Sequence, residues 1–282
     1  MNLVAENSNR SQVTVWVALL LLLIGAMSAY QIVGLNQALL LLIGGALGMT
    51  LYHASFGFTS SWRVFIKERR GRGLRAQMIM LALAVLLFFP ALGAGQLFGQ
   101  PVTGFVSPLS TSVVIGAFIF GIGMQLGGGC ASGTLYTVGG GSARMVVTLI
   151  FFCLGSLLAT LHLDWWFNLP HLAPVSVVKS LGVMPALLLN FALFAVIALA
   201  TVYFEKKRHG ALEIGSPPSE FGWKRFLRGP WPLVWGGILL ILLNFATLAL
   251  AGRPWGVTSA LAVWAAKAAS LGGIDVASWA YW

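Results

Sequence analysis

Seven apolar runs, each long enough or nearly long enough to cross a lipid bilayer, restrict what this chain can fold into. They lie near residues 13–30, 38–54, 76–97, 112–127, 145–162, 184–203 and 231–251, and a shorter apolar run follows at 256–271. A helix rises about 1.5 Å per residue, so about 20 residues cross the roughly 30 Å of hydrocarbon. The chain is 58% hydrophobic and 9% charged, which leaves too little polar surface to cover a water-soluble globule. The sequence therefore predicts an all-α integral membrane protein.

Positive charge indicates how the chain crosses the membrane. Of the seventeen Lys and Arg residues, twelve lie in two segments between apolar runs, 63–75 and 205–228. Neither segment resembles a nucleic-acid-binding fold, so no nucleic-acid partner is expected. By the positive-inside rule both segments face the cytoplasm. Counting spans from them predicts a cytoplasmic N-terminus and places the loops at 31–37, 98–111 and 163–183 outside. The run at 13–30 counts as a span, because it is long for a signal peptide and Glu6 dilutes the charge of Arg10 before it.

Two similar segments suggest an internal repeat. GFTSSW (57–62) follows the second apolar run, and GVTSAL (256–261) follows the seventh. An odd number of spans per repeat inverts the second copy, as in many transport folds. The expected division is a first membrane repeat at 1–163, an external loop at 164–183 and a second, inverted repeat at 184–282 that contains a cytoplasmic linker at 205–230. By the same spacing the second copy of the cysteine segment falls beyond Trp282, so the second repeat is expected to be incomplete within this sequence.

The stretch GMQLGGGCASGTLYTVGGG (123–141) holds one of only two cysteines, Cys130. Its glycine groups, 127–129 and 139–141, predict breaks on either side of a short helix at 131–138. Non-helical backbone at membrane depth is tolerated only where it is buried in protein or lines a cavity. The N-terminus of such a helix offers free N–H groups and partial positive charge to an anion, beside the thiol. The helix terminus and apolar burial shift a thiol pKa in opposite directions, so the protonation state of Cys130 stays open.

Plainer interpretations apply to several of these residues. Glycine-rich breaks also serve as hinges or as close helix contacts. Cys153, between phenylalanines and leucines, is most simply an inert apolar side chain. His53 is a weaker candidate for lining a path. The histidines do not have metal-ligand spacing and the predicted spans contain no carboxylate, so neither a metal nor a cofactor is expected.

The sequence resembles the YeeE/YedE family of bacterial inner-membrane sulfur transporters from about residue 36 onward. The resemblance rests on GMQLGGGCASGTLYTVGGGSARM (123–145), FGFTSSWRVFIKERRGRGLRAQM (56–78) and WGVTSALAVWAAK (255–267). It implies thiosulfate uptake through an hourglass-like fold, in which short re-entrant helices from both faces form a central constriction. It also implies that cysteine thiols pass thiosulfate inward through S–H···S hydrogen bonds, with Cys130 as the central thiol, and that a cytoplasmic sulfur carrier of the TusA type is the partner.

The chain departs from the family pattern at two positions. Members commonly have a cysteine in the block matched by 56–58, where this chain has none, and the later Gly-Cys-Asn segment falls beyond Trp282. A relay of three thiols is therefore not expected within this sequence.

The leading hypothesis is inward transport of thiosulfate or a related sulfur anion, with the Cys130 thiol as hydrogen-bond donor. Two alternatives remain: a membrane thiol enzyme that takes sulfane sulfur as a persulfide, and a non-catalytic membrane scaffold. The predicted path consists of the cysteine break and the two GFTS-like breaks, with the residues Gly128, Gly129, Cys130, Ala131, Ser132, Gly57, Phe58, Thr59, Ser60, Gly256, Thr258 and Ser259.

Overall fold

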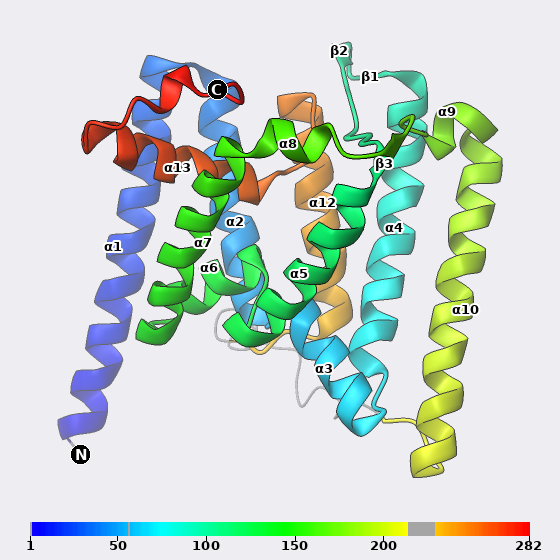
Figure 1. Ribbon diagram of the computed structural model, residues 1–282. Coiled ribbons are helices and arrows are strands. Elements are labelled where there is room, and N and C mark those ends of the chain that lie inside the picture. The colour runs from blue at the N-terminus through cyan, green and yellow to red at the C-terminus, as the bar shows by residue number, and fades with distance from the viewer. Residues whose placement is uncertain (1, 56, 214–228) are drawn as a thin grey trace.

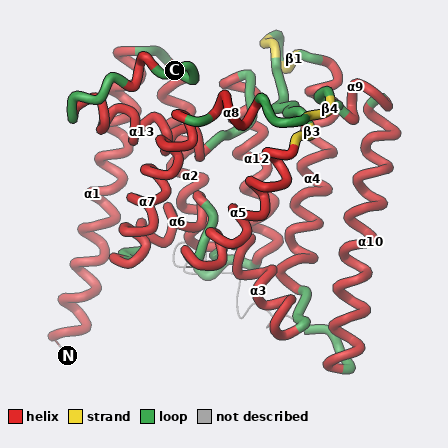
Figure 2. Tube along the Cα trace, in the orientation of Figure 1, coloured by secondary structure: helices red, strands yellow, loops and turns green. Residues whose placement is uncertain are grey.

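The computed structural model describes the backbone of residues 2–55, 57–213 and 229–282, and the side chains from Val13 onward. Nearly all regular structure is helical (Figures 1 and 2). The helices are α1 (Asn2–Ile32), α2 (Leu35–Ala54), α3 (Phe58–Glu68), α4 (Arg72–Ala94), α5 (Thr111–Gly127), α6 (Ala131–Gly139), α7 (Ala143–Leu161), α8 (Leu163–Phe167), α9 (Val177–Leu181), α10 (Val183–His209), α12 (Leu233–Ala251) and α13 (Val257–Leu271), with a 3₁₀ turn η1 at Val276–Ser278. Four two-residue strands form two antiparallel pairs: β1 (Gln96–Leu97) with β2 (Gln100–Pro101), and β3 (Leu109–Ser110) with β4 (His171–Leu172).

Seven helical segments of the described chain are long and apolar enough to cross a membrane. They are Val13–Ile32, Leu35–Glu68, Arg72–Ala94, Thr111–Gly139, Ala143–Leu161, Val183–His209 and Leu233–Ala251. Two of these segments contain a non-helical break, between α2 and α3 and between α5 and α6. Large apolar side chains cover much of the outside, which is the surface that lipid requires. The prediction of an all-α, multi-pass membrane protein is confirmed.

The centre of the bundle is formed by α2, α4 and α12, which are packed on one another. Their buried side chains form one cluster: Leu47, Leu51, Ala54, Ala76, Met80, Leu240 and Ile241. Close approach of α12 to α2 depends on Gly236, where an added Cβ would lie 2.3 Å from the Cβ of Ala54. Small residues at such crossings allow close contact between helix backbones. The resulting van der Waals packing stabilises helix association in lipid, where the hydrophobic effect does not drive it.

A second layer is formed by α7 and α13, and α6 packs between α7 and α2. Leu157 of α7 joins Ala265, Ala266 and Val276 in a separate buried cluster. Cys153 is a partly buried member of the apolar shell of this cluster. Its surroundings fit the interpretation of Cys153 as an apolar packing side chain.

The described parts of the two basic segments, 63–75 and 205–213, lie at the same end of the molecule, the lower end in Figure 1, where α3 and the last turns of α10 are found. The Nε2–H of His209 in α10 donates a hydrogen bond to the carbonyl oxygen of Glu68, with 2.7 Å between Nε2 and O. The helix α13 lies at the opposite, upper end (Figure 1). The helices α3 and α13, which the two GFTS-like segments begin, therefore lie toward opposite ends, which an inverted repeat requires; the repeat itself stays a prediction.

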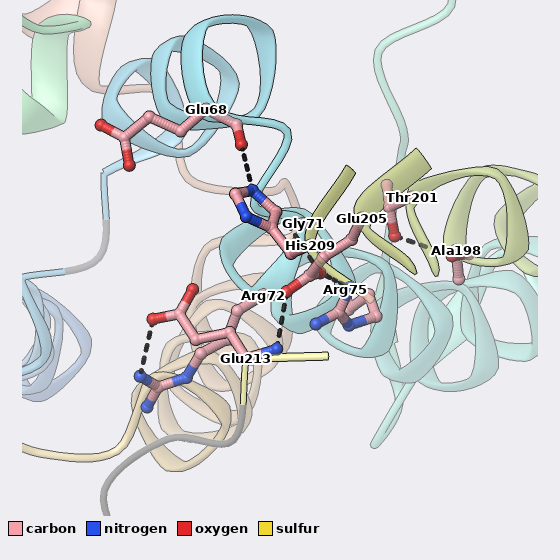
Figure 3. Close-up of polar contacts among 9 residues, drawn as sticks. All are labelled: Glu68, Gly71, Arg72, Arg75, Ala198, Thr201, Glu205, His209 and Glu213. Carbon is pink, nitrogen blue, oxygen red and sulfur yellow. Dashed lines mark hydrogen bonds and ion pairs between the residues drawn. The ribbon is translucent and has the colours of Figure 1, made fainter. Parts of the chain in front are cut away.

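A buried carboxylate fixes the lower end of α10 to the turn between α3 and α4 (Figure 3). The Glu205 side chain is fully buried. One of its oxygens accepts hydrogen bonds from the Arg75 guanidinium at 2.6 Å and the Gly71 N–H at 3.0 Å, and the other accepts from the Glu213 N–H at 2.7 Å. Gly71 permits this contact, because a Cβ there would lie 2.6 Å from the Cβ of Thr201.

The helix α10 corrects one expectation. It continues to His209, so residues 205–209 are helical and not linker; residues 214–228 of the predicted linker lie outside the described chain. Glu205 follows the predicted span at 184–203, and its charge can be buried because it is paired and hydrogen-bonded. Basic residues at 206–208 also suit the negative end of a helix.

Candidate functional site

The cysteine segment breaks one membrane-crossing helix into α5 and α6. Gly128 ends α5 with φ of +83°, a left-handed conformation that favours glycine. At Gly129 an added Cβ would lie 3.2 Å from the backbone N of Thr134 and 3.3 Å from the carbonyl carbon of Gly133. These neighbours are backbone atoms of α6, which cannot move aside as a flexible side chain can. The tight turn into α6 therefore requires glycine at position 129. The helix predicted at 131–138 is confirmed as α6, Ala131–Gly139.

Cys130 occupies the N-cap of α6 in an extended conformation. Its Sγ lies 3.3 Å from Oγ of Ser132, within hydrogen-bonding distance, and its carbonyl oxygen accepts the Thr134 N–H at 2.8 Å. The first N–H groups of any α-helix have no partner within the helix. The half-buried thiol and the Ser132 hydroxyl therefore lie at a helix end that attracts negative charge.

Ser132 lines two cavities. The central cavity, of about 360 Å³, lies between α2, α4 and α12 and is lined by Ser132, Phe58 and Trp255 among mostly apolar side chains. The second, which we call the α2–α6 groove, has a volume of about 400 Å³ and includes Ser132, Trp255 and Tyr136. Phe58 begins the first GFTS-like segment and Trp255 immediately precedes the second. Residues from three separate breaks in the helices therefore meet around the central cavity.

The two GFTS-like segments have the same local geometry. Gly57 and Gly256 are the N-cap residues of α3 and α13. Ser60 donates its hydroxyl hydrogen to the Gly57 carbonyl at 3.0 Å, and Ser259 donates to the Gly256 carbonyl at 2.7 Å. Both helices thus begin with a glycine whose carbonyl is bound by the serine three residues later.

The threonines of these segments differ. Thr59 is 4% exposed, and its hydroxyl has no hydrogen-bond partner among the described residues. Thr134 of α6 is fully buried and its hydroxyl is likewise without a partner in the described part of the chain. Thr258, at the start of α13, is exposed. A buried hydroxyl without a partner is costly, so Thr59 and Thr134 are candidates for contact with a solute or water.

An arginine links the first break to the cysteine break. Arg63 of α3 donates from Nε to Oε1 of Gln125 at 3.0 Å, and from Nη2 to the Gln125 carbonyl at 2.8 Å. Gln125 lies in the last turn of α5, where helix carbonyls have no partner within the helix. A second guanidinium, that of Arg144, lies 4.0 Å from the position of an added Cβ on Gly128. Two cations therefore flank the cysteine break.

The structure brings together only part of the predicted path. Phe58 and Ser132 share the central cavity, and Cys130 lies beside Ser132. Thr59, Ser60, Thr258 and Ser259 line neither of the two cavities. Sequence reasoning did not single out Trp255, Tyr136 or Arg63 as individual side chains. A signal was available for Trp255, because it directly precedes a break, but nothing in the sequence pairs Arg63 with Gln125.

A polytopic membrane protein whose helices break around a shared cavity has the architecture of transport proteins. Comparison with protein families agrees with this class and makes it specific. The chain belongs to the sulphur transport family, whose model matches residues 53–282. The resemblance to the YeeE/YedE family is thereby confirmed.

The chain is also similar to three curated proteins. It is 31% identical over 130 residues to the thiosulfate transporter TsuA of Spirochaeta thermophila, covering 45% of this chain and 38% of that protein. It is 34% identical over 101 residues to the thiosulfate transporter TsuA of Escherichia coli (strain K12), covering 36% of this chain and 28% of that protein. It is 25% identical over 197 residues to the probable transporter YedE of the same strain, covering 67% of this chain and 47% of that protein. The matched regions thus span less than half the length of each relative.

Proposed function

We propose that this chain carries thiosulfate or a closely related sulfur anion inward across the bacterial inner membrane, with the Cys130 thiol as a hydrogen-bond donor to the anion. The observation that carries the proposal is the meeting of Ser132, Phe58 and Trp255, from three helix breaks, at one cavity, with the Cys130 Sγ 3.3 Å from the Ser132 hydroxyl. Family membership and the names of the two TsuA relatives support a sulfur anion as the solute.

The geometry at Cys130 suits a small anion. The thiol, the Ser132 hydroxyl and the N-terminal backbone amides of α6 all provide donors, and the helix terminus adds partial positive charge. A neutral thiol donates S–H, whereas a thiolate would repel the anion, so we infer that the thiol form is the active one. Gly128 and Gly129 let a solute approach the backbone closely, beside Ala131.

The other predicted path residues serve as entrances in this proposal. Gly57, Thr59 and Ser60 lie at the start of α3, a helix on the side of the basic end that the positive-inside rule places in the cytoplasm. Gly256, Thr258 and Ser259 lie at the start of α13, a helix on the opposite side. We further propose a cytoplasmic N-terminus and a TusA-type carrier as the acceptor of sulfur. Co-purification of such a carrier with the intact chain, lost when the exposed Lys206 and Lys207 are changed to Glu, would support this partner.

The deciding experiment is uptake of labelled thiosulfate into bacteria that lack their own route. The parent chain is compared with Cys130→Ala, Cys130→Ser and Cys153→Ala at matched abundance in the membrane. A hydrogen bond to a charged group is worth about 1.5–3 kcal/mol, so loss of the donor should lower uptake roughly 10- to 150-fold. Ser retains a donor and should keep part of the activity, and Cys153→Ala should match the parent. Uptake by Cys130→Ala at the parental rate would refute the role of the thiol.

A further inference from the structure

A third cavity lies beyond the α2–α6 groove, at the end of α6 opposite Cys130. This cavity, which we call the lower vestibule, has a volume of about 390 Å³. Its wall includes the polar side chains of His53, Ser55, Thr137 and Ser142, whereas the α2–α6 groove is mostly apolar. The lower vestibule follows the C-terminal ends of α2 and α6, toward the end of the molecule that carries α3 and the last turns of α10 (Figure 1).

Two tyrosines line both the α2–α6 groove and the lower vestibule: Tyr52 of α2 and Tyr136 of α6. The Tyr52 ring lies on the end of α6, because an added Cβ on Gly140 would be 2.8 Å from its Cε2. The Tyr136 ring packs on the central cluster, and its hydroxyl oxygen lies 3.5 Å from the position of an added Cβ on Gly57. The two side chains thus stand at the shared wall of the cavities, with Tyr136 reaching from α6 to the start of α3.

We infer that Tyr136, together with Tyr52, is the gate through which an anion leaves the Cys130–Ser132 site for the lower vestibule. The inference rests on the proposed function, and it adds the exit route and the side chains that close it. Ser132 lines the groove on one side of Tyr136, and Thr137 and Ser142 line the vestibule on the other. Rotation of one aromatic side chain opens the wall, without a movement of whole helices, because each ring is attached to its helix by two rotatable bonds.

The vestibule matches a hydrated oxyanion better than an apolar solute. The Ser142 hydroxyl and the His53 imidazole can donate hydrogen bonds, and the N-cap of α7 at Ser142 adds the positive end of a 19-residue helix. The Ser55 hydroxyl already donates to the Tyr52 carbonyl at 3.4 Å. The Thr137 hydroxyl already donates to the Gly133 carbonyl at 2.7 Å, so Thr137 offers an oxygen acceptor to water and not a free donor. An anion that passes Tyr136 thus enters a polar space in which it can regain its hydration.

The test measures access to Cys130 and does not depend on transport. With Cys153→Ala as background, Cys130 is the only thiol in the chain. The purified full chain is reconstituted in vesicles, and modification of Cys130 by an anionic, membrane-impermeant methanethiosulfonate is followed from the lower-vestibule side. Tyr136→Ala should react roughly tenfold faster than the parent, and Tyr136→Phe should stay near the parental rate. Tyr203→Ala is the matched control, since Tyr203 is exposed on α10 and lines neither cavity.

The outcomes separate the gate from the transport function. Tyr52→Ala removes the second ring of the gate, so it should also accelerate modification of Cys130. We call Tyr136→Ala and Tyr52→Ala the opening variants; the second provides the test if the first fails to fold. Equal rates for the parent and the folded opening variants, including no reaction in any of them, would overturn the gate. Faster modification of Cys130 in the opening variants, when the parent takes up no thiosulfate, would support the tyrosine gate and refute the proposed substrate. Normal uptake with unchanged modification rates would refute the gate alone.

Discussion

Replacing Glu205 by Ala should destabilise the protein more than any change to an exposed charge. The Glu205 carboxylate is fully buried and accepts three hydrogen bonds, from Arg75 at 2.6 Å, Glu213 N–H at 2.7 Å and Gly71 N–H at 3.0 Å. Its removal leaves the Arg75 guanidinium, whose side chain is 20% exposed, without its counter-ion, and two backbone donors without an acceptor. Breaking a buried ion pair in this way costs about 3–5 kcal/mol, which is a change of roughly two to four orders of magnitude in the unfolding equilibrium.

The assay is reversible unfolding of the purified chain in mixed micelles as the denaturing detergent fraction is raised. The matched control is Glu213→Ala, which removes a carboxylate 3.9 Å from Arg72 while keeping the backbone N–H that binds Glu205. Both side chains of that pair are well exposed, so the control should cost about 0–1 kcal/mol. A loss of less than about 1 kcal/mol for Glu205→Ala would show that the burial argument is wrong.

Three further predictions concern the packing and the cysteine break. Gly236→Ala should lower the melting temperature sharply, because the new Cβ would lie 2.3 Å from the Cβ of Ala54. Gly48→Ala is the control and should be tolerated, because nothing lies within 4 Å of its Cβ; equal melting temperatures for the two variants would contradict the close packing of α12 on α2. Arg63→Gln removes two hydrogen bonds to Gln125, of about 1–3 kcal/mol each, and should release the end of α5. Cys130 should then react with maleimides at least severalfold faster. An unchanged rate would show that the Arg63–Gln125 contact does not position the cysteine break. Thr134→Val should leave the free energy of unfolding equal or raise it by about 1–3 kcal/mol, because the buried hydroxyl has no hydrogen-bond partner among the described residues. A clear loss of stability would show that this hydroxyl does have a partner.

The spans and the cysteine break could be predicted from the sequence because both are local signals. Apolar length located the membrane helices, and the glycine groups around Cys130 marked α6 to within one residue. Both signals are carried by one continuous stretch of sequence. A span needs about twenty apolar positions, and a non-helical turn at membrane depth needs small residues.

The contacts that connect the breaks could not be predicted, because they join residues far apart in the chain. Arg63 and Gln125 are 62 residues apart, and nothing in either segment identifies the other. Glu205 stands in a run of charged residues and has the sequence pattern of a solvated helix end; only the fold places it against Gly71 and Arg75. The role of Tyr136 likewise depends on cavities that form only when α2, α3 and α6 are packed together.

The separation between Arg75 and Glu205 has a consequence for biogenesis. The two residues are 130 positions apart. At about 5–20 residues per second, the ribosome takes roughly 7 to 26 s to add the second after the first. During that interval the rest of α4, the helices α5 to α9 and most of α10 are synthesised, while the α3–α4 turn lacks the Glu205 carboxylate. Arrival of α10 at the insertion machinery is therefore the step that closes this end of the bundle, and nascent chains halted before Glu205 should be cleaved by proteases at the Arg69–Arg72 turn.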